Sequence, residues 1–222
     1  MKNKIGLLSI MVLILLITGC NSKNKKNGVQ GTDSVAVTQV ESTHEININT
    51  VYSAIHWKGF KPGGSHHGTL KLKEGKAYYQ GDSLVGGYAV VDMKSLKVED
   101  LEGEDAEKLR GHLLSQDFFD ADQYPQARFE ITSISRKTAD TLDLSGNLTI
   151  KDVTKNISFP VGIGDKTIDK NKVFCAFAAP FTINRVDWNV KYGSKNVFKN
   201  LGDKFIDDGI EISIDLQSNP VD

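Results

Sequence analysis

Residues 210–217 read Ile210-Glu211-Ile212-Ser213-Ile214-Asp215-Leu216-Gln217, so apolar and polar side chains alternate at every position. Successive side chains of a strand point to opposite faces of a sheet. This period of two therefore predicts a β-strand with one buried face and one solvent face. The same period returns along most of the chain from residue 46 onward. The sequence therefore predicts an all-β domain.

Turn signals divide this alternating region into short segments. Pro62-Gly63-Gly64 predicts a loop, Glu74-Gly75-Lys76 a tight turn, and Gly86-Gly87 a bend or bulge. Seven to nine strands at such spacing indicate an antiparallel sandwich or barrel. The strands besides 210–217 are expected at 51–58, 70–73, 77–80, 84–96, 127–135, 141–150, 156–163 and 173–183.

Two short helices are expected among these strands. Residues 104–114 place Ala106, Leu109 and Leu113 on one side and acidic residues in the first turn. A second helix is expected at about 196–201. The alternation leaves open whether the interior is packed or hollow, because barrels of about eight strands hold either side chains or one small ligand. The aromatic residues fit both, and a packed core is the commoner outcome: Trp57, Tyr78, Tyr88, Phe129, Phe159, Phe174, Phe177 and Phe181.

The N-terminus has the pattern of a secretory signal peptide. Lys2 and Lys4 precede an apolar stretch from Ile5 to Ile17, which is too short for a membrane span of about 20 residues. Thr18-Gly19-Cys20 then resembles a bacterial lipobox. We expect residues 1–19 to be a lipoprotein signal peptide and Cys20 to become the acylated first residue of the mature chain.

The segment after Cys20 differs from the rest in composition. It is polar and without aromatic residues to about Glu45, so residues 20–45 are expected to be a lipidated cysteine and a flexible tether, followed by one domain at 46–222. Cys175 lies in an apolar strand and would have no disulfide partner once Cys20 is acylated. The formal net charge of −1 offers no electrostatic basis for nucleic-acid binding.

An ordered set of motifs resembles the YceI-like family of exported lipocalin-like proteins, over about 46–216. The resemblance implies an extended eight-stranded antiparallel barrel with a long apolar interior. It also implies binding of a polyisoprenoid or similar long-chain amphiphile rather than catalysis. Many members have His-Gly where this chain has Lys151-Asp152. The motifs are Ser53-x-Ile55-x-Trp57, His67-Gly68, 111–120, Tyr124-Pro125, Gly146–Ile150, Val153-Thr154-Lys155, Ile183–Trp188 and Asn200–Lys204.

Several residues are candidates for contact with such a ligand, each with a structural alternative. Arg185 is either the partner of an anionic headgroup or one side of a salt bridge to Asp187 or Asp92, with the structural role slightly favoured. Trp57 and Trp188 are expected in the wall, although packing alone would explain them. The ligand-binding candidates are Trp57, His67, Phe118, Phe119, Phe129, Phe177, Arg185, Trp188 and Tyr192.

Two catalytic or metal interpretations are set aside. Gly81-Asp82-Ser83-Leu84 matches a serine-hydrolase signature, but no histidine follows His112 to act as the base. His66 and His67 are adjacent, which places them on opposite faces of a strand and argues against a metal cluster with His56. We expect no enzyme activity, no cofactor and no metal.

The expected function is that of a lipid-anchored envelope protein, in the outer membrane and facing the periplasm, that binds an isoprenoid, quinone or fatty-acyl compound. Asn21 follows Cys20, where some bacteria use Asp to retain lipoproteins at the inner membrane. The alternative is a structural or interaction module whose barrel is filled by its own side chains. The oligomeric state is left open.

Overall fold

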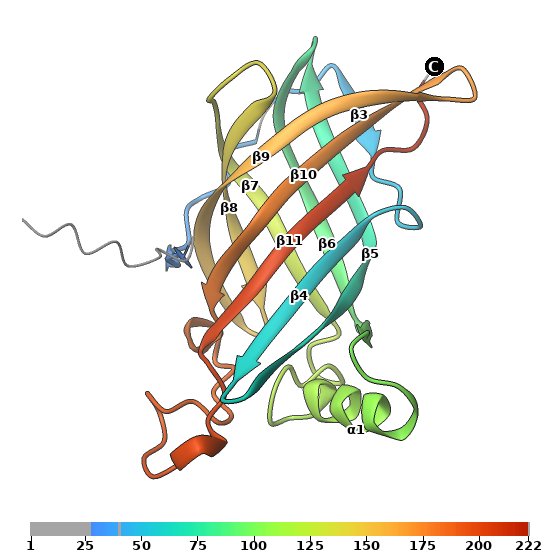
Figure 1. Cartoon of the computed structure of the whole chain (residues 1–222). Helices are drawn as coiled ribbons and strands as arrows, with labels where there is room; N and C mark the ends of the chain where they lie inside the picture. Colours follow the sequence, from blue (N-terminus) through green and yellow to red (C-terminus); the bar gives the residue numbers. More distant parts are fainter. Residues whose placement is uncertain (1–27, 40, 222) are drawn as a thin grey trace, which may run out of the picture.

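The computed structural model describes residues 28–39 and 41–221. Eight antiparallel strands follow one another around a ring, and the last pairs with the first (Figure 1). This confirms the prediction of an eight-stranded antiparallel barrel. Closure leaves no long unpaired edge. The strands of the ring are β4 (Ala54–Lys61), β5 (Gly64–Gln80), β6 (Ser83–Val98), β7 (Gln126–Arg136), β8 (Thr141–Ile150), β9 (Val153–Ile168), β10 (Asn171–Asn184) and β11 (Gly209–Gln217).

Smaller elements lie at the ends and on the wall of this ring. The helix α1 (Gly103–Leu114) follows β6 and lies across one end of the barrel (Figure 1). It confirms the helix expected at 104–114. No helix in the described part of the chain is long and apolar enough to cross a bilayer. The remaining elements are β1 (Gly28–Val29), β2 (Thr32–Asp33), β3 (His44–Asn47) and the 3-10 helices η1 (Arg185–Trp188) and η2 (Gly202–Lys204).

The turn predicted at Glu74-Gly75-Lys76 is wrong. These residues lie inside β5, which continues without interruption for 17 residues. The register shifts between Leu72 and Glu74, so a bulge stands where a turn was expected. Gly75 has a packing role, because a Cβ atom there would lie 3.1 Å from the Ile48 side chain. The irregularity expected near Gly86-Gly87 is confirmed by the register shift between Tyr78 and Tyr79 of the same strand pair.

The helix expected at 196–201 is also wrong. Residues 189–201 form turns, with η1 before them and η2 after them. Asn189 and Asn200 have left-handed backbone with φ of 59° and 67°. Left-handed residues interrupt an α-helix, and asparagine adopts this conformation more readily than most residues.

The end of the barrel opposite α1 is closed by chain crossings. Residues 47–49 cross from β5 to the C-terminal segment, where the Asn219 amide donates to the Asn47 carbonyl. The Ser53 hydroxyl donates to the Gln217 carbonyl and accepts from the Gln217 amide. Ile46 is 4% exposed at this end.

The interior of the barrel half nearest this closed end is packed. Phe159 stacks on Phe181 with ring centroids 4.5 Å apart, and Phe129 lies 5.4 Å from Phe159. Gly146 makes room for the Phe129 ring, because a Cβ atom there would lie 2.2 Å from it. Packing and a hollow interior, which the sequence presented as alternatives, therefore occur together in different halves of one barrel.

Residues 28–33 belong to the barrel wall. β9 and β10 pair only through 162–168 and 171–177, and beyond these residues the two strands separate. β1 pairs with Thr182 and Ile183 of β10, and β2 pairs with β9. The expectation of a flexible tether up to residue 45 is therefore corrected for these two segments. The ring of eight strands itself closes within residues 54–217, and β1 and β2 add to it from the N-terminal side.

Candidate functional site

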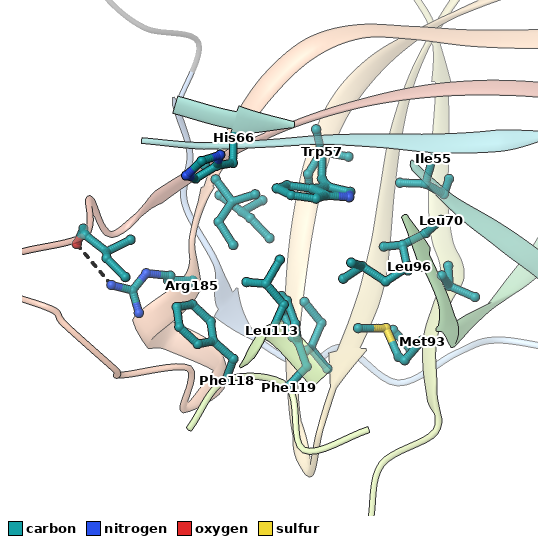
Figure 2. Close-up of a pocket in the computed structure, with 18 of the residues that line it drawn as sticks. Ile55, Trp57, His66, Leu70, Met93, Leu96, Leu113, Phe118, Phe119 and Arg185 are labelled. Carbon is teal, nitrogen blue, oxygen red and sulfur yellow. Dashed lines mark hydrogen bonds between the residues drawn. The ribbon is translucent and has the colours of Figure 1, made fainter. Parts of the chain in front are cut away.

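A cavity of about 310 Å³ occupies the half of the barrel next to α1. Its walls come from alternate residues of neighbouring strands, which point inward because side chains of a strand alternate between faces. Aliphatic side chains form its deep part, and Figure 2 shows several of them facing one another. They include Ile55, Leu70, Val91, Met93, Leu148 and Ile212.

The α1 helix and the residues after it cover the cavity. Leu109 and Leu113 stand four residues apart and so lie on the same side of the helix, where both line the cavity. No residue of α1 is fully buried. Phe118 and Phe119 line the same space, and Phe118 is only 5% exposed. The apolar side of α1 therefore forms part of the cavity wall, which explains why its leucines are not fully buried.

Trp57 lies in the wall between the deep part and the mouth (Figure 2). Its Nε1 donates a hydrogen bond of 3.2 Å to the Lys97 carbonyl. Gly68 opposite permits this approach, because a Cβ atom there would lie 1.8 Å from the same carbonyl oxygen. The His67-Gly68 motif thus has a packing reason at its glycine.

Polar groups gather at the mouth. His66 Nδ1 lies 2.7 Å from Asp100 Oδ2, and the His67 amide donates to Asp100 Oδ1. Burial alone would raise the pKa of Asp100, but the hydrogen bonds from the His67 amide and the His66 ring lower it below its usual value. Lys61, His112 and the Asp207 backbone region complete this polar rim. The arrangement suits a ligand with an apolar chain and a polar end.

Arg185 is 2% exposed and serves as a structural clamp. Its guanidinium donates to the carbonyls of Val190, Ile206 and Asp207 at 2.7, 3.0 and 3.0 Å. Its ionic partner is Asp208 at 3.5 Å, in place of the expected Asp187 or Asp92. Burial lowers the pKa of Arg185, and the nearby Asp208 and Asp207 carboxylates oppose this. Arg185 also lies over the Phe118 ring at the cavity rim (Figure 2).

Four of the nine candidate ligand contacts line the cavity. They are Trp57, Phe118, Phe119 and Arg185. His66, whose ring lies at the mouth, is not among the nine candidates, because the sequence does not reveal the register of β5.

Three candidates lie on the outside. His67 is exposed on the outer face, one residue from inward-facing His66. Phe177 is 54% exposed, since Ala178 beside it takes the inward position at 0% exposure. Tyr192 is 42% exposed and packs edge-on against His112. Their expected place in the cavity is therefore corrected, and for His67 and Phe177 the reason is the alternation of strand faces.

Two candidates are core residues. Phe129 packs against Phe159 in the filled half of the barrel. Trp188 is completely buried, and its Nε1 donates to the Leu148 carbonyl at 2.9 Å. Trp188 also lies behind the N-terminal wall segment, within 3.4 Å of a Cβ position at Gly31. Trp188 is therefore a packing residue of the core, as the structural alternative predicts, and does not line the cavity.

Cys20 lies outside the described residues. Ser83 begins β6 directly after a hairpin turn, at Gln80–Ser83 of the β5–β6 pairing. Within residues 28–39 and 41–221, no three histidine, cysteine or acidic side chains come close enough to hold a metal ion.

The fold and the cavity define a class of protein, the closed antiparallel β-barrel with an apolar cavity under a short helix. The YceI-like domain family matches residues 36–218, and the chain belongs to this family. A UPF0312 protein of Pseudomonas putida (strain W619) is 29% identical over 150 residues, which cover 67% of this chain and 76% of that protein. Protein YceI of Shigella flexneri is 37% identical over 83 residues, 36% of this chain and 42% of that protein.

Solved structures share the fold at low sequence identity. BcnA of Burkholderia cenocepacia superposes with a TM-score of 0.60 at 18% identity, over 78% of this chain and 99% of BcnA. A polyisoprenoid binding domain from Saccharophagus degradans superposes with a TM-score of 0.58 at 13% identity, over 80% of this chain and all of that domain. At such identities the likeness shows the fold.

Proposed function

We propose that this protein holds the apolar chain of a long amphiphile in the cavity beneath α1, with the polar end of the ligand at the mouth. A polyisoprenoid, a quinone and a fatty-acyl compound all have this form. The observation that carries the proposal is the cavity itself, which has aliphatic and aromatic walls and polar groups only at its rim. Family membership and the Saccharophagus degradans relative, described as a polyisoprenoid binding domain, support it.

The size of the cavity limits how much of a chain it encloses. Its volume of about 310 Å³ lies at the lower end of ordinary ligand pockets. An engineered cavity of about 150 Å³ takes up benzene, so this one accommodates roughly a dozen carbon atoms. At about 0.8 kcal/mol for each buried methylene, such a segment contributes about 10 kcal/mol before entropic costs. A longer chain would extend through the mouth.

Native mass spectrometry tests the proposal. The chain from Gly28, purified from a bacterial host without detergent, should carry an amphiphile that solvent extraction releases. Ala127 is 7% exposed and lines the cavity, so Ala127→Trp should fill the space and abolish the bound mass. Ala139→Trp, in an exposed turn, is the matched control.

If no bound chain is found, and added polyprenyl phosphate and fatty acid are not taken up, the proposal fails. A structural or interaction module would then describe the protein better. The filled aromatic half of the barrel is the observation that favours this second function.

We further propose that Cys20 anchors the protein by acylation, in the outer membrane and facing the periplasm. The support is the Thr18-Gly19-Cys20 sequence after an apolar segment, with Asn21 following. Two or three acyl chains hold a protein firmly on a membrane. Mass spectrometry of the N-terminal peptide should find acyl groups on Cys20, and Cys20→Ser should remove them. An unmodified wild-type peptide would contradict this anchor.

A further inference from the structure

A surface loop next to the cavity mouth has a composition that the binding of a ligand inside the barrel does not explain. We call residues 191–205 the mouth loop. It lies between η1 and β11 and extends beyond the barrel at the same end as α1, at the lower left of Figure 1. Tyr192 connects it to the mouth, since its ring lies 4.7 Å from His112 and 5.4 Å from Phe118.

The mouth loop exposes apolar side chains. Tyr192, Val197 and Phe198 are 42%, 41% and 48% exposed, and all three lie within the stretch 192–198. Single exposed apolar residues are common on protein surfaces, whereas several together mark an interaction site. The loop therefore has an apolar contact surface.

The same loop is strongly basic. It contains Lys191, Lys195, Lys199 and Lys204, against Asp203 as its one carboxylate. Among the described residues, none of these lysines is in an ion pair, and Lys195 lies over the Phe205 ring at 4.3 Å. Lys61, at the tip of the β4–β5 hairpin, is exposed at the same end of the barrel.

The loop is held in place, so its apolar residues are presented outward by an ordered backbone. Arg185 binds the carbonyls of Val190 and Ile206, one at each base of the loop. The Ile206 amide donates to the Gly193 carbonyl at 2.8 Å. Ser194 is completely buried, and its carbonyl accepts from the Phe198 amide at 2.8 Å.

We propose that the mouth loop docks on the surface of an anionic lipid bilayer. Lysines beside exposed aromatic and aliphatic residues complement a negatively charged headgroup layer above an apolar interior. Val197 and Phe198 would enter the interface, and the lysines would meet phosphate groups. Docking in this orientation turns the cavity mouth toward the bilayer, so an apolar chain passes between them with little exposure to water. The acidic first turn of α1 lies on the other flank of the mouth (Figure 1).

Vesicle co-sedimentation of the chain from Gly28, which lacks Cys20, tests this contact without the acyl anchor. The protein should bind phosphatidylcholine vesicles containing phosphatidylglycerol and not vesicles of phosphatidylcholine alone. Removing one lysine should weaken binding about fivefold, so Lys195→Gln with Lys199→Gln should weaken it more than tenfold. Val197→Ser with Phe198→Ser should do the same, and added salt should reduce wild-type binding.

The closed end of the barrel provides matched controls. Val51 and Tyr52 are 74% and 69% exposed there, so Val51→Ser with Tyr52→Ser removes similar apolar surface. Lys166→Gln with Lys170→Gln removes two exposed lysines from the β9–β10 hairpin. Both control pairs should bind vesicles like the wild type.

Three results would overturn the proposal. One is absence of binding to the anionic vesicles. Another is equal weakening by the mouth-loop pairs and the closed-end pairs. The last is a concentration-dependent dimer that Val197→Ser with Phe198→Ser abolishes, which would make a second copy the partner. Ala127→Trp, with its cavity filled, should still bind vesicles, so this test and the test of the cavity ligand fail separately.

Discussion

Arg185 illustrates at the residue scale how one side chain can support a whole segment. Its three backbone acceptors belong to residues on both sides of the mouth loop, and Asp208 neutralises its charge. Hydrogen bonds from a charged donor contribute about 1.5–3 kcal/mol each. A buried guanidinium with three acceptors is well suited to this role, because its planar donors have fixed directions.

Arg185→Met should therefore lower stability. Loss of the clamp leaves three carbonyls and a buried carboxylate without their partner, so we expect about 3–5 kcal/mol less unfolding free energy. Urea unfolding measures this, with Arg136→Met at the exposed end of β7 as control. Affinity for phosphorylated and neutral lipids should fall together. Selective loss of phosphorylated lipids at unchanged stability would instead assign Arg185 to the headgroup.

Asp100 should make the mouth sensitive to acid. Its pKa is lowered in the folded protein, so its stabilising contribution is fully present above the unfolded value of about 3.9. The contribution disappears as pH falls through the folded value. The stability difference between wild type and Asp100→Asn should thus be greater at neutral pH than below about pH 4. Urea midpoints measured across this range check it, and a difference that stays constant would contradict it.

At the element scale, the N-terminal segment completes the barrel wall. β1 and β2 occupy the space where β9 and β10 separate, and Trp188 is buried behind them. Asn147 holds the segment further along, because its side chain accepts from the Val35 amide and donates to the Val35 carbonyl. A polar segment can form part of the wall here because β1 and β2 pair with the barrel through backbone hydrogen bonds, which do not require apolar side chains.

Starting the chain at Glu45 instead of Gly28 should therefore destabilise the barrel. The loss of several backbone hydrogen bonds, at about 1 kcal/mol each, predicts about 2–4 kcal/mol. Urea unfolding followed by tryptophan fluorescence measures the loss. In the folded state of the shorter chain, Trp188 should also be more accessible to a fluorescence quencher. Asn147→Ala in the longer chain should reproduce part of the loss. Identical midpoints for the two chains would show that the segment contributes nothing to stability.

On the scale of the whole molecule, the barrel is divided into a filled half and a hollow half. Phe181 stands at the boundary, since it pairs with Ile212, which lines the cavity, and stacks on Phe159. The closed end lies beyond this aromatic stack, and the mouth lies at the α1 end. Under the proposed function, the stack would limit the depth to which an apolar chain enters.

Phe181→Ala should deepen the cavity and shift binding toward longer chains. Removing a buried aromatic ring costs about 3–5 kcal/mol, so Phe181→Leu is the milder variant if the barrel is too unstable. Phe177→Ala, on the outer face of the same strand, is the matched control. Competition between prenyl alcohols of increasing length measures the preference. An unchanged preference would show that the stack does not limit chain length.

The amino-acid sequence was sufficient for most strands of the ring and for the helix α1, because alternation at 210–217 and the apolar side of 104–114 are local patterns. Its ordered motifs were sufficient for the family. Trp57, Phe118 and Phe119 are candidates on the sequence alone and all line the cavity, although the sequence left packing as an alternative for them. It could not assign His66 rather than His67 to the mouth, or Phe177 to the outer face, because a shift of one residue reverses every side chain of a strand. The continuous β5 strand, the partners of Arg185 and the wall role of residues 28–33 depend on contacts between residues far apart in the chain. Such contacts form only when the ring closes, so the tertiary structure alone divides the barrel into a packed half and a hollow half.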